Sequence, residues 1–312
     1  MRLPLLAIVL PLGLAAPAEA KDVVVYVCGK DLCRVAPDGT QKQRLTRDGA
    51  RSGPYSRPAI SRTGRRLAYR KGTRGRVYTA RVAKKRLNGV RRIGPAPGGP
   101  ADATQFDVAI SRDGRRVAWV ELRVNVVFDS IDYRRYSATF SGADVRQVAA
   151  SGGRPFVAFF DTRQILREGL ADSVETRPDA VTVDQGLCVP DPESAQNGTC
   201  GDHGPQAAFD PQGRHLRHPH VSADGKRLVA TAYRTDAQVD DSVEQAGQIL
   251  LFDTAGALPV RELTGGPSDR YPSFSPSGGK VIYERTGSVR VIAAAGGSAK
   301  RLVKGVQPTW GR

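Results

Sequence analysis

The chain has 312 residues, of which only 6% are aromatic, and a formal net charge of +16 that comes mainly from arginine and that we interpret as spread along the whole sequence. A nucleic-acid binder usually gathers its basic residues on one face beside aromatic residues that stack on bases, so this composition argues against nucleic acid as the partner. Two interpretations of the charge remain: an arginine-rich solvated surface, and attraction toward an anionic envelope polymer or an acidic partner.

The first twenty residues have the three sections of a secretory signal peptide. Arg2 gives the positive start, an apolar stretch follows it, and Ala18-Glu19-Ala20 supplies the small residues that a signal peptidase requires. We predict cleavage after Ala20 and an exported protein, periplasmic or extracellular. The apolar stretch is shorter than the ~20 residues that cross a bilayer, and no later segment reaches that length, so we expect no transmembrane anchor.

Four cysteines occur as two close pairs, which suits an oxidising compartment. Cys28 and Cys33 form the first pair, and Cys188 and Cys200 form the second. Neither pair has the spacing of a zinc site or of a Cys-x-x-Cys redox motif. We therefore predict two local disulfides, the second closing a loop insertion near 184–206 that is rich in Gly, Pro, Asp and Asn.

A repeated unit dominates residues 21–312, which we interpret as a single all-β domain. The unit reads PAISRTGRRLAYR from Pro58, DVAISRDGRRVAWV from Asp107, PHVSADGKRLVATAY from Pro219 and PSFSPSGGKVIYER from Pro272. Each copy has an apolar-alternating strand, a tight turn with glycine and a second strand, so each predicts a β-hairpin. A second hairpin pattern follows each copy. Two hairpins make a four-stranded antiparallel sheet, which is the blade of a β-propeller.

The spacing of the repeats predicts six blades. The turn glycines of the four copies lie 50, 111 and 53 residues apart, so one degenerate repeat falls in the middle gap. Pro308-Thr309-Trp310 supplies a first strand and Val23 to Val27 a second one, so the two ends of the chain should share one blade and close the ring. The predicted blades cover residues 306–312 with 22–46, 58–94, 105–149, 152–214, 218–264 and 271–303.

The repeat resembles that of the TolB-type β-propellers, which are relatives of the WD-repeat proteins. The resemblance rests on the P-x-x-S-x-D-G-x-x-[LV] unit, followed by an apolar strand, a D-G or G-G turn and R-x-L-T, and it covers nearly the whole chain after Ala20. TolB itself has an extra α/β domain before its propeller, and we expect none here between Ala20 and Val23. The repeated residues form turns and strands and specify a fold, not a site. We expect a monomeric scaffold that binds a protein or another envelope partner without catalysis.

In such a propeller the first strand of each blade lines a central channel, so the resemblance implies that the loops entering these strands surround one mouth of a funnel. Arginine and tyrosine are frequent anchors of recognition sites. Solvated loop residues between blades are the alternative interpretation. The predicted mouth residues are Tyr55, Arg57, Gln105, Arg217, His218, Asp269, Arg270, Tyr271 and Gln307.

The histidines suggest an alternative function. All four lie between His203 and His220, and His215, His218 and His220 are close enough to share a transition metal. Polysaccharide lyases with a similar propeller use a histidine-bound metal in the funnel. The alternative is therefore a metal-dependent polysaccharide lyase or hydrolase. No cofactor is predicted for the scaffold, and a calcium ion held by backbone carbonyls in the channel is the other metal that we consider.

Overall fold

The structure is a computed structural model, and it describes residues 22–94, 104–125, 130–149, 157–159, 165–168, 181–183, 186–188, 207–208, 215–224, 226–233, 247–253 and 261–312. Most of these residues lie in β-strands, and a single-turn helix, α1 (Gly49–Ser52), precedes β4. No helix within these ranges is long and apolar enough to cross a membrane.

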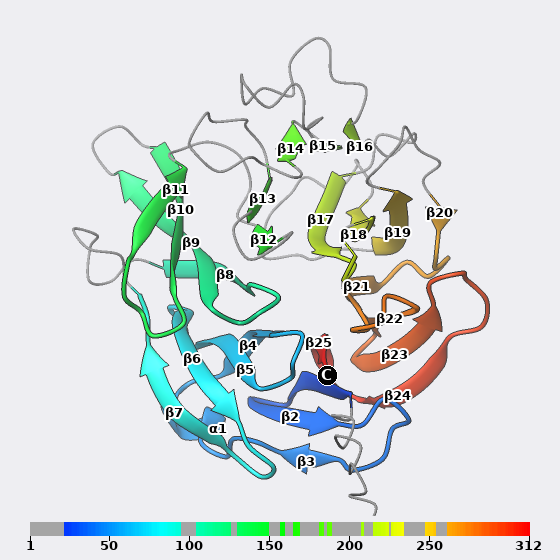
Figure 1. The fold of residues 1–312 in the computed structure, drawn as a ribbon, viewed down its shortest axis with the longest axis horizontal. Helices are drawn as coiled ribbons and strands as arrows, with labels where there is room; N and C mark the ends of the chain where they lie inside the picture. The colour runs from blue at the N-terminus through cyan, green and yellow to red at the C-terminus, as the bar shows by residue number, and fades with distance from the viewer. Residues whose placement is uncertain are drawn as a thin grey trace, which may run out of the picture.

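Five sheets, each with four antiparallel strands, surround a common centre (Figure 1). Their strands, from the innermost outward, are β25 (Val306–Gly311), β1 (Val23–Cys28), β2 (Asp31–Val35) and β3 (Gln43–Arg44); β4 (Tyr55–Ile60), β5 (Arg66–Lys71), β6 (Arg76–Val82) and β7 (Leu87–Arg92); β8 (Thr104–Ile110), β9 (Arg116–Asn125), β10 (Ser130–Thr139) and β11 (Arg146–Ala149); β17 (His215–Val221), β18 (Arg227–Tyr233), β19 (Gly247–Asp253) and β20 (Arg261–Glu262); and β21 (Asp269–Phe274), β22 (Lys280–Arg285), β23 (Ser288–Ala293) and β24 (Lys300–Lys304). The all-β propeller of four-stranded antiparallel blades is thereby confirmed for these five repeats.

The prediction of six such blades is wrong. In the region expected to be the fourth blade, 152–214, the described residues form one sheet of five short strands, and its β13–β14 pair is parallel. Its sequence lacks the Ser-x-Asp-Gly turn that begins the first hairpin at Ser111 and Ser222, and the spacing of repeats does not by itself specify an antiparallel register. The strands are β12 (Val157–Phe159), β13 (Ile165–Glu168), β14 (Val181–Val183), β15 (Gly186–Cys188) and β16 (Ala207–Ala208).

The two ends of the described chain share one blade, as predicted. β25 pairs antiparallel with β1, and Val24 lies opposite Trp310 in the register. Figure 1 shows this pairing as a red strand beside a dark blue one near the centre. Because the last strand pairs with the first, the inner edge of β1 is covered and the two ends of the chain are joined within one blade.

The repeated serine forms the turn of the first hairpin. In the blade β8–β11, the Ser111 hydroxyl donates to Asp113 at 2.7 Å and accepts from the Arg116 N–H at 2.9 Å. The Gly114 N–H donates to the Ser111 carbonyl at 2.8 Å. The hydroxyl bond to the backbone N–H five residues later recurs at Ser61, Ser222 and Ser275.

The repeated basic residue after the turn joins neighbouring blades. The Arg66 guanidinium donates to the carbonyl of Gly114 in the next blade at 3.1 Å, and Arg227 donates to the carbonyl of Gly278 at 2.9 Å. Apolar side chains also pack between blades: Val25 and Leu32 of the first blade share a core cluster with Tyr69 of the second. The repeat therefore encodes both a turn and a contact between blades.

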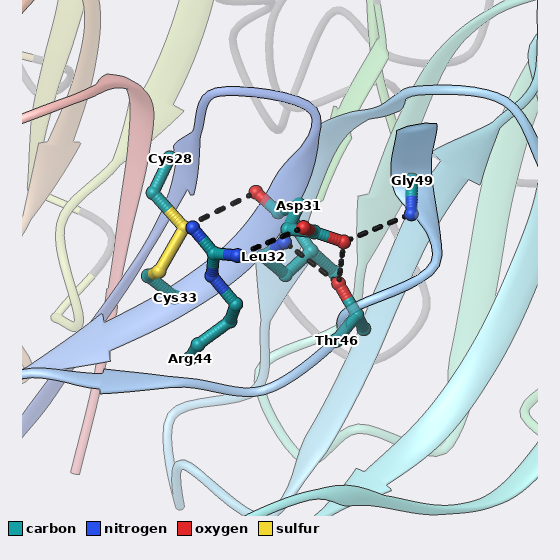
Figure 2. The surroundings of a disulfide bond; sticks show 7 residues. All are labelled: Cys28, Asp31, Leu32, Cys33, Arg44, Thr46 and Gly49. Atoms are coloured by element: carbon teal, nitrogen blue, oxygen red, sulfur yellow. Dashed lines mark hydrogen bonds and ion pairs between the residues drawn. A yellow bond between two sulfur atoms is a disulfide. The ribbon is translucent and has the colours of Figure 1, made fainter. Parts of the chain in front are cut away.

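Cys28 and Cys33 form the predicted disulfide across the β1–β2 hairpin (Figure 2). Beside it, Asp31 accepts hydrogen bonds from Thr46 Oγ1 and from the Gly49 N–H, both at 3.0 Å. These bonds hold the start of α1 against the hairpin. Of the second predicted pair, Cys188 lies in β15, whereas Cys200 is outside the described residues, so the second disulfide stays a prediction.

Replacing both Cys28 and Cys33 with serine is expected to lower the free energy of unfolding by about 2 kcal/mol, because the unfolded chain loses the constraint of this short loop. Denaturant unfolding of the variant and of the oxidised wild type, followed by circular dichroism, measures the difference. Serine substitution is preferable to a reductant, which would also act on Cys188 and Cys200. An unchanged unfolding midpoint would mean that the β1–β2 hairpin does not depend on the disulfide.

Candidate functional site

A cavity of about 130 Å³ lies between the inner strands β4, β8, β17, β21 and β25. The five strands contribute equivalent positions of the repeat. At the mouth of the cavity these positions are Arg57, Asp107, His218, Tyr271 and Gln307.

Four of these mouth residues share an unusual backbone conformation. Arg57, His218, Tyr271 and Gln307 have φ between 50° and 54°, and a proline follows each of them. The register of each inner strand against its neighbour is interrupted at this point. A positive φ is costly for residues with a Cβ, by roughly 1–3 kcal/mol each, so surrounding contacts must maintain it. Proline is tolerated because the channel side of an inner strand has no neighbouring strand to receive an N–H bond.

The mouth side chains contact one another across blades. The Arg57 guanidinium carbon lies 4.5 Å from the centre of the Tyr271 ring, and the His218 and Tyr271 rings are 4.3 Å apart. The backbone N–H of Arg57 donates a hydrogen bond to Gln307 Oε1 at 2.7 Å. These contacts place a cation, two rings and an amide together at one opening, although the residues come from four different blades.

Charges of both signs occur at this mouth. Desolvation, and then the charge of Arg57, lower the pKa of Arg70 to about 10, whereas the charges of Asp107 and Tyr271 raise it.

Asp107 was not among the predicted mouth residues. It occupies the position that precedes proline in the other repeats, but Val108 follows it. Aligning the repeats on the turn serine, four residues after this position, would have identified it.

Three predicted mouth residues, two buried and one half-buried, contact other strands and do not line the cavity. Gln105 accepts from the Val77 N–H at 2.6 Å and donates to Glu121 at 3.0 Å. Asp269, which is fully buried, makes a two-pronged ion pair with Arg285 at 2.5 and 2.6 Å. Arg270 lies 3.7 Å from Glu284. Their contacts join strands and neighbouring blades.

Tyr55 also packs beneath the mouth. Its hydroxyl donates to Asp48 at 2.7 Å, and Lys71 donates to the same carboxylate at 2.6 Å. Desolvation and the bond to Asp48 raise the pKa of Tyr55. Desolvation also opposes ionisation of Asp48, but its hydrogen bonds from Lys71, Tyr55 and Ser52 prevail and lower its pKa.

Only part of the predicted histidine cluster has its side chains among those that the structure describes. His215 and Arg217 belong to β17, but their side chains are outside the described part of the structure. His218 and His220 both line the cavity. His220 Nδ1 accepts from the Phe274 N–H at 3.2 Å, so Nε2 carries the proton and donates to Ser273 Oγ at 3.3 Å. Within the described ranges, no three His, Cys, Asp or Glu side chains are grouped so as to hold a metal.

A belt of hydrogen bonds around the channel wall was not anticipated. The residue after the proline accepts a bond from a backbone N–H of the next blade: His220 from Phe274, Ser273 from Trp310 at 3.2 Å, and Thr309 from Ile60 at 3.3 Å. These N–H groups are buried and face no further strand, so they need side-chain acceptors. The sequence feature that could have predicted this belt is a polar residue directly after the proline in strands that are otherwise apolar.

Comparison with protein families and with curated proteins finds no match. Solved structures share the fold. TolB from Acinetobacter baumannii has a TM-score of 0.61 and 15% identity, with 93% of this chain and 66% of that one covered. Putative TolB from Agrobacterium tumefaciens gives 0.55 and 16%, covering 92% and 91%. A chain of a nidogen/laminin complex gives 0.59 and 12%, covering 93% and 98%. The chain thus spans slightly less than two thirds of the A. baumannii structure, and it has the fold of TolB-type propellers.

Proposed function

We propose that the protein is an exported propeller scaffold that binds a protein or another envelope partner at the channel mouth, without catalysis. The observation that carries this proposal is the repeated positive-φ position, which gathers Arg57, His218, Tyr271 and Gln307 around one cavity. A strained backbone conformation costs free energy, so other contacts must stabilise it in each of the four blades. Such conformations occur most often at binding and active sites. Arginine stacked on tyrosine is a typical anchor of protein interfaces.

Export is supported by two independent features. The N-terminal sequence has the pattern of a signal peptide, although residues 1–21 lie outside the described part of the chain. The Cys28–Cys33 disulfide suits the periplasm or the extracellular space. The TolB structures have the same fold, and a protein partner at a propeller mouth is our inference for this chain.

Site-specific photo-crosslinking tests the mouth as the binding surface. A photoreactive phenylalanine analogue at Gln307 is expected to crosslink a discrete partner in envelope fractions. The same analogue at Ser298, an exposed residue of the β23–β24 turn at the opposite end of its blade, serves as the control and is expected to give no such product.

In the protein that carries the photoreactive analogue in place of Gln307, changing Arg57 to glutamine is expected to reduce the crosslinked product about tenfold, because the cation over the Tyr271 ring is lost. Quantified crosslinking yield at a fixed protein concentration measures this, with the melting temperature confirming that the variant is folded. Equal crosslinking from Gln307 and Ser298, or a yield unaffected by the Arg57 change, would contradict a binding site at the mouth.

A further inference from the structure

The positive charge of the chain is concentrated in one blade. Between Tyr55 and Gly94, the segment that contains β4 to β7, the sequence has fourteen Lys and Arg residues and no Asp or Glu. Residues 104–149, which contain the next blade, have seven basic and six acidic residues. The interpretation of the charge as distributed along the chain is therefore wrong.

Six of these basic side chains are exposed at the end of the blade opposite the channel mouth. The β4–β5 and β6–β7 turns lie side by side there, because the Val82 N–H donates to the Arg65 carbonyl at 2.9 Å. Across the described ranges, no Asp or Glu forms an ion pair with any of the six. We name this set the basic end; its exposed members are Arg62, Arg65, Arg81, Lys84, Lys85 and Arg86.

The turn residue that is acidic in two other blades is neutral at the basic end. Asp113 and Asp224 each accept a hydrogen bond from the serine two residues earlier, at 2.7 and 2.5 Å. Thr63 makes the same contact with Ser61 at 3.2 Å, without a charge. The turn is thus preserved here while its negative charge is absent.

The neighbouring blade neutralises its own arginines at the same end. Arg115 lies 3.6 Å from Asp113, and Arg116 and Arg146 lie 3.3 and 2.7 Å from Asp144. An arginine-rich composition alone would not distinguish these two adjacent blades. The basic end is therefore a local property of β4–β7.

The shape of the basic end favours a linear ligand. Its two turns connect the first with the second strand and the third with the fourth, so their centres lie roughly 10 Å apart along the radius of the propeller. Inward, Arg62 and Arg112 line a second cavity of about 70 Å³. The positive charges therefore form a radial stripe that begins at the channel and ends at the outer strands.

Other polyanions fit this surface less well. In this blade Tyr55 and Tyr69 are buried, and Tyr78 stacks on Tyr69 at 5.7 Å, so no aromatic ring is presented for stacking on bases. Among the described residues, Val90 is the large apolar side chain that is exposed, which offers little for insertion into a bilayer.

We propose that the basic end binds a linear acidic polysaccharide, with guanidinium and ammonium groups contacting successive carboxylates or sulfates. This site is separate from the channel mouth and does not depend on the function proposed for it. Binding is governed by exposed charges, so its affinity falls as the salt concentration rises.

The test measures binding of the full mature chain to fluorescent fragments of polygalacturonate and of dextran sulfate at about 50 and 150 mM salt. The variant Lys84→Gln/Lys85→Gln/Arg86→Gln is expected to bind about tenfold more weakly, since each exposed contact contributes roughly 0.5 kcal/mol. The control Lys280→Gln/Lys300→Gln/Arg301→Gln removes the same charge from exposed positions of another blade and is expected to change affinity less than about twofold. Comparing the two polymers distinguishes carboxylate from sulfate as the preferred group.

A second variant adds charge without disturbing the turn. Thr63→Asp installs the residue that Asp113 and Asp224 have at this position, so the fold is retained while affinity is expected to fall about threefold. Equal weakening by both triple variants, or no affinity for either polymer at low salt, would overturn the proposal. Tighter binding to phosphatidylglycerol vesicles or to duplex DNA, lost in the Lys84 triple variant, would also overturn it by assigning the basic end to another polyanion. Arg57→Gln at the mouth is expected to leave polymer affinity unchanged.

Discussion

Changing Asp269 to alanine is expected to lower the free energy of unfolding by about 3 kcal/mol. Its carboxylate is fully buried and receives two hydrogen bonds from the Arg285 guanidinium, so the substitution leaves a cation without its counter-charge. Breaking a buried ion pair costs about 3–5 kcal/mol, and the low end applies because the Arg285 side chain is 29% exposed and regains some water. Denaturant unfolding gives the value directly.

The matched control for Asp269 is Arg146→Ala. It removes an ion pair of similar length, 2.7 Å, whose arginine is 71% exposed, and is expected to cost less than about 0.5 kcal/mol. If Asp269→Ala kept wild-type stability but lost the Gln307 crosslink, Asp269 would act in binding, as the sequence had suggested, and the structural role would be wrong.

The propeller could be predicted from the sequence because its determinants are local. The Ser-x-Asp-Gly turn fixes a hairpin within five residues, as Ser111 and Arg116 show, and the repeat copies that hairpin along the chain. The region 152–214 lacks this turn. Its blade was inferred from spacing alone, and spacing does not specify strand pairing.

The site was harder to predict because it depends on contacts between blades. Of the mouth residues predicted from the resemblance, Arg57, His218, Tyr271 and Gln307 line the cavity between the inner strands. Asp269 and Gln105 lie only two residues before equivalent positions, yet their side chains are buried in ion-pair or hydrogen-bond contacts. The interruption in strand register decides which side chain beside it points into the channel. The residue types at Gln105 and Asp269 do not indicate that their side chains point elsewhere.

The basic end was not predicted from the sequence for a different reason. A net charge averages over the chain, so the absence of Asp and Glu between Tyr55 and Gly94 is hidden by acidic residues elsewhere. Charge counted blade by blade would have revealed it once the repeats were aligned. Thr63 in place of the repeated aspartate was the single-residue signal.

Acidification is expected to weaken the channel wall through His220. Desolvation, and then the charge of Arg112, lower the pKa of His220 to about 4 from its usual 6.5. Its Nδ1 accepts the Phe274 N–H, and a protonated imidazole has no acceptor to offer. Because the unfolded chain takes up this proton more readily, the contribution of His220 is fully present above about pH 6.5 and is lost as the pH falls toward 4. The loss is at most about 3 kcal/mol.

The variant His220→Thr isolates this contribution, since Thr309 fills the equivalent position of another blade and accepts the same bond there. Unfolding free energies of wild type and variant, measured from pH 7.5 to 4.5, should converge as the pH falls, because carboxylate protonation affects both proteins equally while only the wild type loses the histidine contribution. Parallel curves would mean that His220 titrates normally and that its bond to Phe274 is not maintained in solution. Convergence would establish that the ring of blades is held at the channel by neutral side-chain acceptors, with His220 the one member of the belt that responds to pH.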